Sequence, residues 1–191
     1  MSRPDSTHGA LLDRYLATYD VRSRHEIQVD APADVSYKAA RQLDIGRSLP
    51  ASLLFAIRAL PHLLTGKARL HRAITLETFL EFGFVTLEEN PPKEIVLGAI
   101  GRFWRPDSGM VRVAPDEFTT FDRPGFARAV LAFTVEERGI AASLLATETR
   151  VACTDPSSRR KFLLYWGAIG PFSGVIRRLM LNQVKRAAEA A

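Results

Sequence analysis

The pair of residues whose types and spacing could support acid–base chemistry is Glu148 and Arg150, in a strand-like segment, residues 141–153. A carboxyl group facing an apolar cavity has a raised pKa and could act as a general acid. The spacing of two, however, puts both side chains on one strand face, where ion pairs to Arg128 or Arg102 across the sheet are more common. We therefore favour a structural ion pair, and Glu148 is a catalytic candidate only if the protein is an enzyme.

His25 is the second candidate for proton transfer, because an imidazole titrates near neutral pH. It begins an alternating segment, residues 25–29, between Arg24 and Glu26. A position at the end of a strand is usually half-solvated, so we favour an ordinary strand residue and keep His25 as catalytic only for an enzyme. Glu88 is a third ionisable group that a reaction could use.

The sequence lacks the spacing patterns of metal and cofactor sites. Cys153 is the only cysteine, which excludes an internal disulfide and a cysteine-based zinc site. There is no Gly-rich phosphate loop, no Gly-x-Ser-x-Gly elbow and no His-Glu-x-x-His helix. The four histidines are scattered without the spacing of metal ligands: His8, His25, His62 and His71. We therefore expect neither a metal nor a cofactor.

Two alternating segments, residues 125–136 and 141–153, indicate where a cavity could form. Side chains alternate between the two faces of a strand, so the apolar series from Ala127 to Val135 shares one face that must be covered. In the second segment Thr147 and Thr149 share a face with apolar residues, opposite Glu148 and Arg150. The two hydroxyls could be a polar foothold in an apolar chamber, although threonine is also simply a good strand residue.

A long helical pattern after Asp155 must cover that sheet. Asp155 is a helix cap and Pro156 fits the first turn, and apolar residues then recur every three or four positions. A straight helix of about 34 residues would span roughly 50 Å, which is longer than a domain of this size is wide. We therefore expect a kink at Pro171. A kinked helix fills the hollow of a sheet unevenly and leaves ligand space. The residues expected to line it are Phe103, Trp104, Leu131, Phe133, Thr147, Thr149, Tyr165, Trp166, Ile169 and Phe172.

The preceding elements complete an α+β pattern. After the first strand, Asp30 is a predicted cap and Pro32 lies in the first turn of a helix that stops near Gly46. An apolar helix over residues 49–64 follows. The segments with strand character are residues 74–80, 82–88, 94–104, 110–113, 125–136 and 141–153, and turn residues join the second to the third and the fifth to the sixth as hairpins.

With 191 residues, the chain fits one domain, residues 21–191, preceded by an appendage, residues 1–20, that we expect to pack loosely. The net charge of +5 lies in residues 155–191, which hold seven basic and two acidic residues. We favour a solvated outer helix face, with contact to an anionic membrane as the alternative. Nucleic acid binding is not expected, since the basic residues lack interleaved aromatics. The start of the chain has no signal-type apolar run, so we expect a cytoplasmic protein.

Residues 25–35 (HEIQVDAPADV) and 147–178 (TETRVACTDPSSRRKFLLYWGAIGPFSGVIRR), together with the element order, make the chain resemble the START-like or polyketide-cyclase (SRPBCC) superfamily, within an uncharacterised bacterial branch. The resemblance covers most of residues 20–190. It implies a helix-grip fold, in which a curved antiparallel sheet wraps around a long C-terminal helix. It also implies a deep hydrophobic cavity. Members include binders, lipid carriers, cyclases and oxygenase subunits, and no catalytic residue of a cyclase matches a position here.

Three hypotheses of function follow. The first is a non-catalytic carrier or sensor that holds a hydrophobic small molecule, such as a lipid, polyketide, sterol or quinone-like compound. The second is an enzyme of the polyketide cyclase or dehydratase type, which needs an ionisable group pointing into the cavity. The third is a peripheral lipid-transfer module that docks on anionic membranes through its basic helix. The sequence leaves the ligand and the oligomeric state open.

Overall fold

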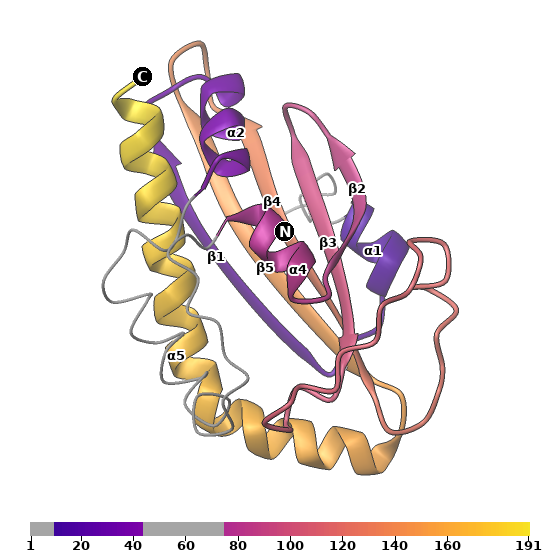
Figure 1. The fold of residues 1–191 in the computed structure, drawn as a ribbon. Helices are drawn as coiled ribbons and strands as arrows, with labels where there is room; N and C mark the ends of the chain where they lie inside the picture. Colours follow the sequence, from indigo (N-terminus) through magenta and orange to yellow (C-terminus); the bar gives the residue numbers. More distant parts are fainter. Residues whose placement is uncertain (1–9, 44–74) are drawn as a thin grey trace, which may run out of the picture.

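The computed structural model describes residues 10–43 and 75–191, and its centre is a five-stranded antiparallel sheet (Figure 1). The order across the sheet is β1-β5-β4-β3-β2, so the chain's first strand lies beside its last. The predicted α+β helix-grip fold is confirmed. The strands are β1 (Val21–Val29), β2 (Val85–Asn90), β3 (Glu94–Gly101), β4 (Ala127–Glu137) and β5 (Ser143–Cys153).

Both predicted hairpins form. In the β4–β5 hairpin, Leu131 pairs with Thr149 and Phe133 pairs with Thr147. The turn contains Gly139 at φ +114°, a backbone conformation that residues with a side chain rarely adopt. The same register places alternate side chains on opposite faces of the sheet, which we call the inward face, toward α5, and the outward face.

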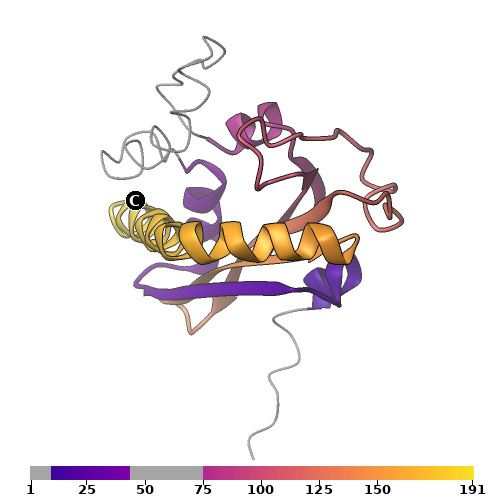
Figure 2. The ribbon, with the colours of Figure 1, turned by 90° about the horizontal axis from the view of Figure 1, so that it is seen from below.

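The helices are α1 (Ala10–Leu16), α2 (Ala33–Arg41), α4 (Leu76–Glu81) and α5 (Pro156–Glu189). Asp155 caps α5 by accepting a hydrogen bond from the Ser158 backbone N–H, and Pro156 lies in the first turn, both as predicted. Pro171 lies near the middle of α5, and the helix changes direction about midway, first crossing one end of the sheet and then running along β1 (Figures 1 and 2). The kink is therefore confirmed.

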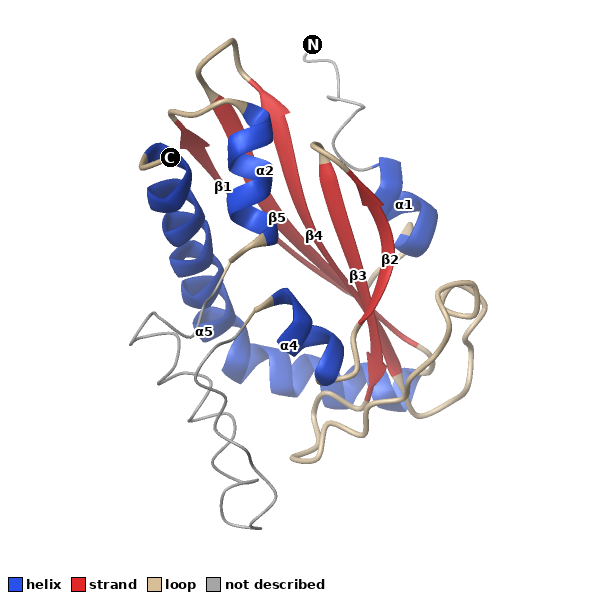
Figure 3. Ribbon diagram, turned by 45° about the horizontal axis from the view of Figure 1, so that its top comes forward, coloured by secondary structure: helices blue, strands red, loops and turns tan. Residues whose placement is uncertain are grey.

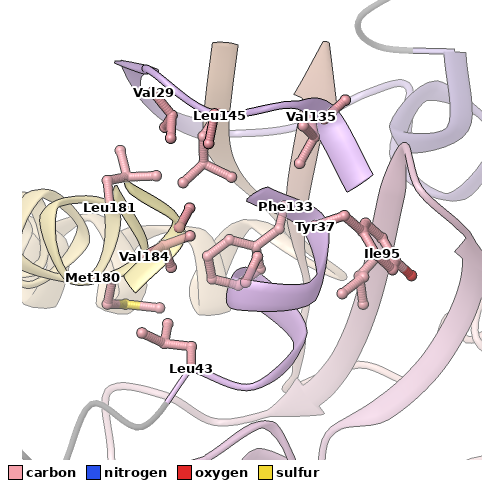
Figure 4. Packing of buried hydrophobic residues seen from close by; sticks show 14 of the residues in the cluster. Val29, Tyr37, Leu43, Ile95, Phe133, Val135, Leu145, Met180, Leu181 and Val184 are labelled. Atoms are coloured by element: carbon pink, nitrogen blue, oxygen red, sulfur yellow. The ribbon is translucent and has the colours of Figure 1, made fainter. Parts of the chain in front are cut away.

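The main core lies between the inward face, α2 and the second half of α5 (Figure 4). Leu131, Phe133 and Val135 extend from β4 as one apolar face, as their alternation predicts. From α5, Met180, Leu181 and Val184 point toward them. These three α5 residues are at most 4% exposed, so side chains fill the space between the sheet and this part of α5.

The outward face has its own apolar cover. Leu12 and Leu16 of α1 are buried against Val96, Ile100 and neighbouring residues of the sheet. We expected residues 1–20 to pack loosely, but the part of this segment that the structure describes does not. The reason is that α1 covers apolar side chains that would otherwise face water.

Several element predictions need correction. Residues 74–80 were expected as a strand, but residues 76–81 form α4, because Leu and Glu favour helices and Phe79 and Leu80 then both reach the main core. Residues 110–113 make only an isolated bridge, between Val111 and Ile100.

The boundaries near the first strand also differ. β1 starts at Val21 rather than His25, since pairing with β5 continues to Val151. Pro32 is the N-cap of α2, and the side chain of Asp30 makes no capping bond. α2 ends at Arg41, five residues before Gly46. The predicted helix over residues 49–64 lies outside the described residues.

Candidate functional site

A groove of about 400 Å³ runs between β1 and the bend of α5. Trp166, Pro171 and Val175 provide apolar walls from the helix, and His25 reaches the groove from the inward face of β1. The lining residues are Arg22, Ser23, His25, Trp166, Gly170, Pro171, Gly174, Val175 and Arg178. The groove lies where the kinked helix was expected to leave space.

Two glycines on α5 create room beside the strand. A Cβ atom at Gly174 would lie 3.4 Å from His25 Nε2, and one at Gly170 would lie 3.1 Å from Trp166 Nε1. Larger side chains at either position would therefore enter the groove or displace its walls. Gly167, on the same helix, has no other described side chain or strand within 4 Å of its Cβ position, so it does not shape the groove.

Arg177 lies beside the groove in a buried position, with only 8% of its surface exposed. Its Nε and Nη2 groups donate to Thr149 Oγ1, at 3.2 and 2.8 Å, and its Nη1 group donates to Ser173 Oγ. The guanidinium also lies 6.0 Å from the ring centroid of Trp166, which lines the groove. Burial lowers the pKa of Arg177 to about 10, and the side chain stays charged at neutral pH.

His25 and Thr147 lie opposite each other on β1 and β5, and both face inward. Burial, followed by the charges of Arg177 and Arg178, lowers the pKa of His25, so the imidazole is neutral at pH 7. The Nδ1 atom of His25 and the Oγ1 atom of Thr147 are buried and find no hydrogen-bond partner among the residues that the structure describes. Unfilled polar atoms in such positions call for a partner from water or a ligand. Together with Thr149 and Arg177, these residues form what we call the polar cluster.

Glu148 lies on the outward face, as its spacing from Thr147 predicts, and is 3% exposed. It accepts hydrogen bonds from Arg22 Nε, at 2.8 Å, and Arg150 Nε, at 2.7 Å, and Arg24 Nη1 lies 3.6 Å from it. Burial alone would raise the pKa of the carboxyl, but the hydrogen bonds from Arg22 and Arg150 outweigh it and lower the pKa. Glu148 is therefore a structural anion and is not poised as a general acid.

The partners of Glu148 differ from those predicted. Arg128 donates to the Thr119 carbonyl and Arg102 donates to the Gly125 carbonyl. The register explains this, because Glu148 lies opposite Ala132 on β4 and opposite Arg24 on β1. The arginines that Glu148 meets across the sheet are therefore Arg22 and Arg24 of β1, which is far away in the sequence.

Glu88 also serves the outward side of the molecule. It accepts hydrogen bonds from the Tyr15 hydroxyl, at 2.8 Å, and from Arg14, at 3.1 Å, both on α1. Of the three ionisable candidates, His25 is the one that lines the groove.

The residues expected to line a cavity fall into separate groups. Phe103, Trp104, Tyr165 and Trp166 belong to an aromatic cluster around Phe162. In it, the Phe103 and Trp166 rings lie 6.4 and 5.8 Å from the Phe162 ring between centroids. Of the predicted set, Trp166 contacts the groove directly.

The other predicted lining residues lie in the core or at the surface. Leu131 and Phe133 are part of the main core, and Thr147 and Thr149 are in the polar cluster. Ile169 is half-buried, whereas Phe172 is 54% exposed on α5. Where the chain is described, the groove is open to solvent and partly polar, unlike the enclosed apolar chamber that the sequence favoured.

Sequence reasoning missed Arg177, the most distinctive residue beside the groove. A signal was present: Arg177 lies eleven residues after Trp166 and seven before Val184, so helical periodicity puts all three on one face. A cation in the inward stripe of an amphipathic helix is unusual, because arginine side chains are rarely buried without a specific partner.

Neither a metal centre nor a membrane span is visible among residues 10–43 and 75–191. No three side chains of His, Cys, Asp or Glu in these ranges are placed to share a metal ion. No helix in the same ranges combines the length and the apolar character needed to cross a bilayer.

No protein-family model matches the sequence, and neither does any curated protein. Solved structures with some similarity include the di-domain ARO/CYC protein BexL (14% identity, TM-score 0.35, 88% of this chain and 46% of BexL covered). Others are norcoclaurine synthase from Thalictrum (14%, 0.34, 85% and 94%) and the Zhui aromatase/cyclase from a Streptomyces species (10%, 0.30, 88% and 93%). The chain thus spans about half the length of BexL. Cyclases are among the proteins that the sequence resemblance names, but similarity at this level carries no argument about ligand or reaction.

Proposed function

We propose that this protein binds a hydrophobic small molecule in the groove between β1 and the bend of α5, without transforming it. The observation that carries the proposal is the groove itself, whose volume of about 400 Å³ falls in the usual range for small-molecule sites. Apolar walls from Trp166, Pro171 and Val175 provide the burial that drives such binding, and the polar cluster gives orientation.

The first test is native mass spectrometry of gently purified protein, followed by solvent extraction and a thermal-shift screen with fatty acids, sterols, quinones and aromatic polyketides. We expect a bound organic molecule, or an increase in Tm with at least one compound class. Protein that is repeatedly ligand-free and shows no shift with any compound would contradict the proposal.

A matched pair of variants locates the site. Gly174→Leu adds a side chain that starts 3.4 Å from His25 Nε2, inside the groove, whereas Gly167→Leu adds the same atoms where nothing lies within 4 Å. We expect the thermal shift to disappear in the first variant and to persist in the second. Equal shifts in both would place binding elsewhere.

A cyclase or dehydratase is the second candidate function, and the position of His25 favours it. This neutral imidazole lines the groove and has a free Nδ1 atom, so it could accept a proton from a bound ligand. Incubation of a poly-β-ketone thioester with the protein and with His25→Gln should then give a dehydrated, cyclised product only with His25 present. An unchanged substrate mass in both samples would contradict the cyclase or dehydratase function and leave ligand binding as the proposed function.

A further inference from the structure

The feature that points beyond a general hydrophobic site is the electrostatic setting of Arg177. An ion is costly to remove from water unless a counter-ion or full hydrogen bonding compensates. No carboxylate lies in ion-pair distance of Arg177 among the residues that the structure describes; its partners are the neutral hydroxyls of Thr149 and Ser173. The buried cation thus has no counter-ion within the described part of the chain.

Arg150 provides the comparison within the same chain. It is as buried as Arg177, at 4% exposed, but forms ion pairs with both Glu148 and Asp13. Arg150 lies on the outward face, in the ion-pair cluster with Glu148, and Arg177 lies on the inward face, next to the groove. Arg150 is therefore neutralised by carboxylates of the chain itself, whereas Arg177 is not neutralised by any described residue.

The polar cluster, of which His25 lines the groove, has unused hydrogen-bonding capacity. A guanidinium has five N–H donors, and Arg177 uses three of them for Thr149 and Ser173. Thr147 Oγ1 and His25 Nδ1 also have no partner in the described part of the chain, and Thr147 is fully buried. Two adjacent N–H groups of one guanidinium and a hydroxyl fit the two oxygens of a carboxylate.

The charged residues that line the groove also favour an anionic ligand. Arg178 lines the groove and has no acidic partner among the described residues, while Arg22 is already paired with Glu148. Within residues 10–43 and 75–191, no Asp or Glu lines the groove. An anion that enters it is thus attracted by Arg178 and Arg177 and is repelled by no carboxylate of the lining.

We propose that the ligand is an amphiphilic carboxylic acid, held with its carboxylate against Arg177 and Thr147 and its apolar body along Trp166, Pro171 and Val175. This inference rests on the proposed binding function and specifies its ligand class. It also explains why a cation occupies the inward stripe of α5.

The test compares each acid with its neutral amide, which has nearly the same shape. Decanoate with decanamide, and 2-naphthoate with 2-naphthamide, are titrated into the wild-type protein by calorimetry. We expect each acid to bind at least tenfold more tightly than its amide. Equal affinities would overturn this inference and leave the proposed function intact, whereas binding of none of the four compounds would count against both.

Variants then assign the difference to one residue. Arg177→Met should reduce the affinity for decanoate to that for decanamide and leave decanamide unchanged, while Arg186→Met, on the exposed last turn of α5, should change neither. If Arg177→Met does not fold, Arg177→Lys keeps the charge and loses the paired donors, and a smaller preference for the acid is expected. A preference for the acid that survives in both Arg177 variants would contradict the assignment.

Acetate and phosphate decide whether the apolar body matters. We expect acetate and phosphate to bind at least tenfold more weakly than decanoate, because they bury little apolar surface. Tight binding of either ion would identify a simple anion site and contradict the proposal that the ligand is amphiphilic.

Discussion

At the residue scale, the position of a charged group relative to the two faces of the sheet decides its role. Thr147, Glu148, Thr149 and Arg150 alternate along β5, and their side chains enter different environments. Glu148 and Arg150 join an ion-pair cluster on the outward face, while Thr147 and Thr149 face inward, in the polar cluster. Neighbours in sequence thus belong to two separate clusters on opposite faces of the sheet.

Glu94, at the start of β3, gives a pH-dependent prediction. Burial, followed by the charges of Glu88 and Glu148, raises the pKa of Glu94 to about 7 from the ordinary value of 4.5, and no described residue forms a hydrogen bond with its Oε1 atom. The folded state therefore holds a proton that the unfolded state loses. Stability falls as the pH rises from 4.5 through 7. We expect Glu94→Gln to be more stable than wild type by about 1–2 kcal/mol at about pH 8.5, and similar to wild type at about pH 4.

Urea denaturation at both pH values measures this difference. Glu137→Gln is the control, because Glu137 is exposed at the end of β4 and its replacement removes no buried charge. A Glu94→Gln variant with the same free energy difference at both values would contradict the role of buried charge.

At the scale of elements, close packing between strands and their cover sets the tolerance to added atoms. β3 has Gly98 on its outward face, where Leu87 of β2 and Phe118 of the following loop meet above the strand. α5 shows the opposite situation at Gly167, which has open space around it. The same substitution should therefore have opposite effects in the two elements.

Gly98→Ala is expected to destabilise the fold by about 1–3 kcal/mol, because overpacking a filled core displaces its neighbours. The added Cβ would lie 2.8 Å from Leu87 Cδ1 and 2.9 Å from Phe118 Cδ2. Gly167→Ala, inside a helix, should instead stabilise it by up to about 1 kcal/mol. Thermal and urea unfolding of both variants measure the effects; a Gly98→Ala protein as stable as wild type would mean that this layer can relax.

At the scale of the whole molecule, the sheet has apolar cover on both faces (Figure 3). α2, α4 and the second half of α5 lie on the inward side, and α1 lies on the outward side. α1 also contributes Asp13 to the Arg150 ion pair and Tyr15 to the Glu88 hydrogen bond. The N-terminal helix is therefore part of the folded unit.

Leu12→Ala tests this. Leu12 is fully buried, and removing its side chain leaves a cavity between α1 and the sheet, so we expect a loss of about 2–4 kcal/mol in the free energy of unfolding. Leu164→Ala is the matched control, since Leu164 is 80% exposed on α5 and should change stability little. Equal effects in urea denaturation would show that α1 contributes nothing to global stability.

The sequence by itself determined the features that depend on neighbouring residues. The alternation in residues 125–136 and 141–153 predicts a hairpin and its faces, and Asp155, Pro156 and Pro171 mark where the last helix starts and bends. Each signal works within a few residues, through capping bonds, side-chain alternation or the missing proline N–H. The same local reasoning fails for α4, whose short apolar pattern suits both a strand and a helix until Phe79 and Leu80 find the core.

Only the tertiary structure decided which groups meet. Glu148 pairs with Arg22, 126 residues away, because β1 and β5 become neighbours in the sheet. Arg177 meets Thr149 because the bend of α5 returns the helix along β1. Such contacts depend on strand order and helix direction, which are set by burial of the whole apolar surface and leave no mark in local sequence. The groove and the cation beside it are products of that assembly.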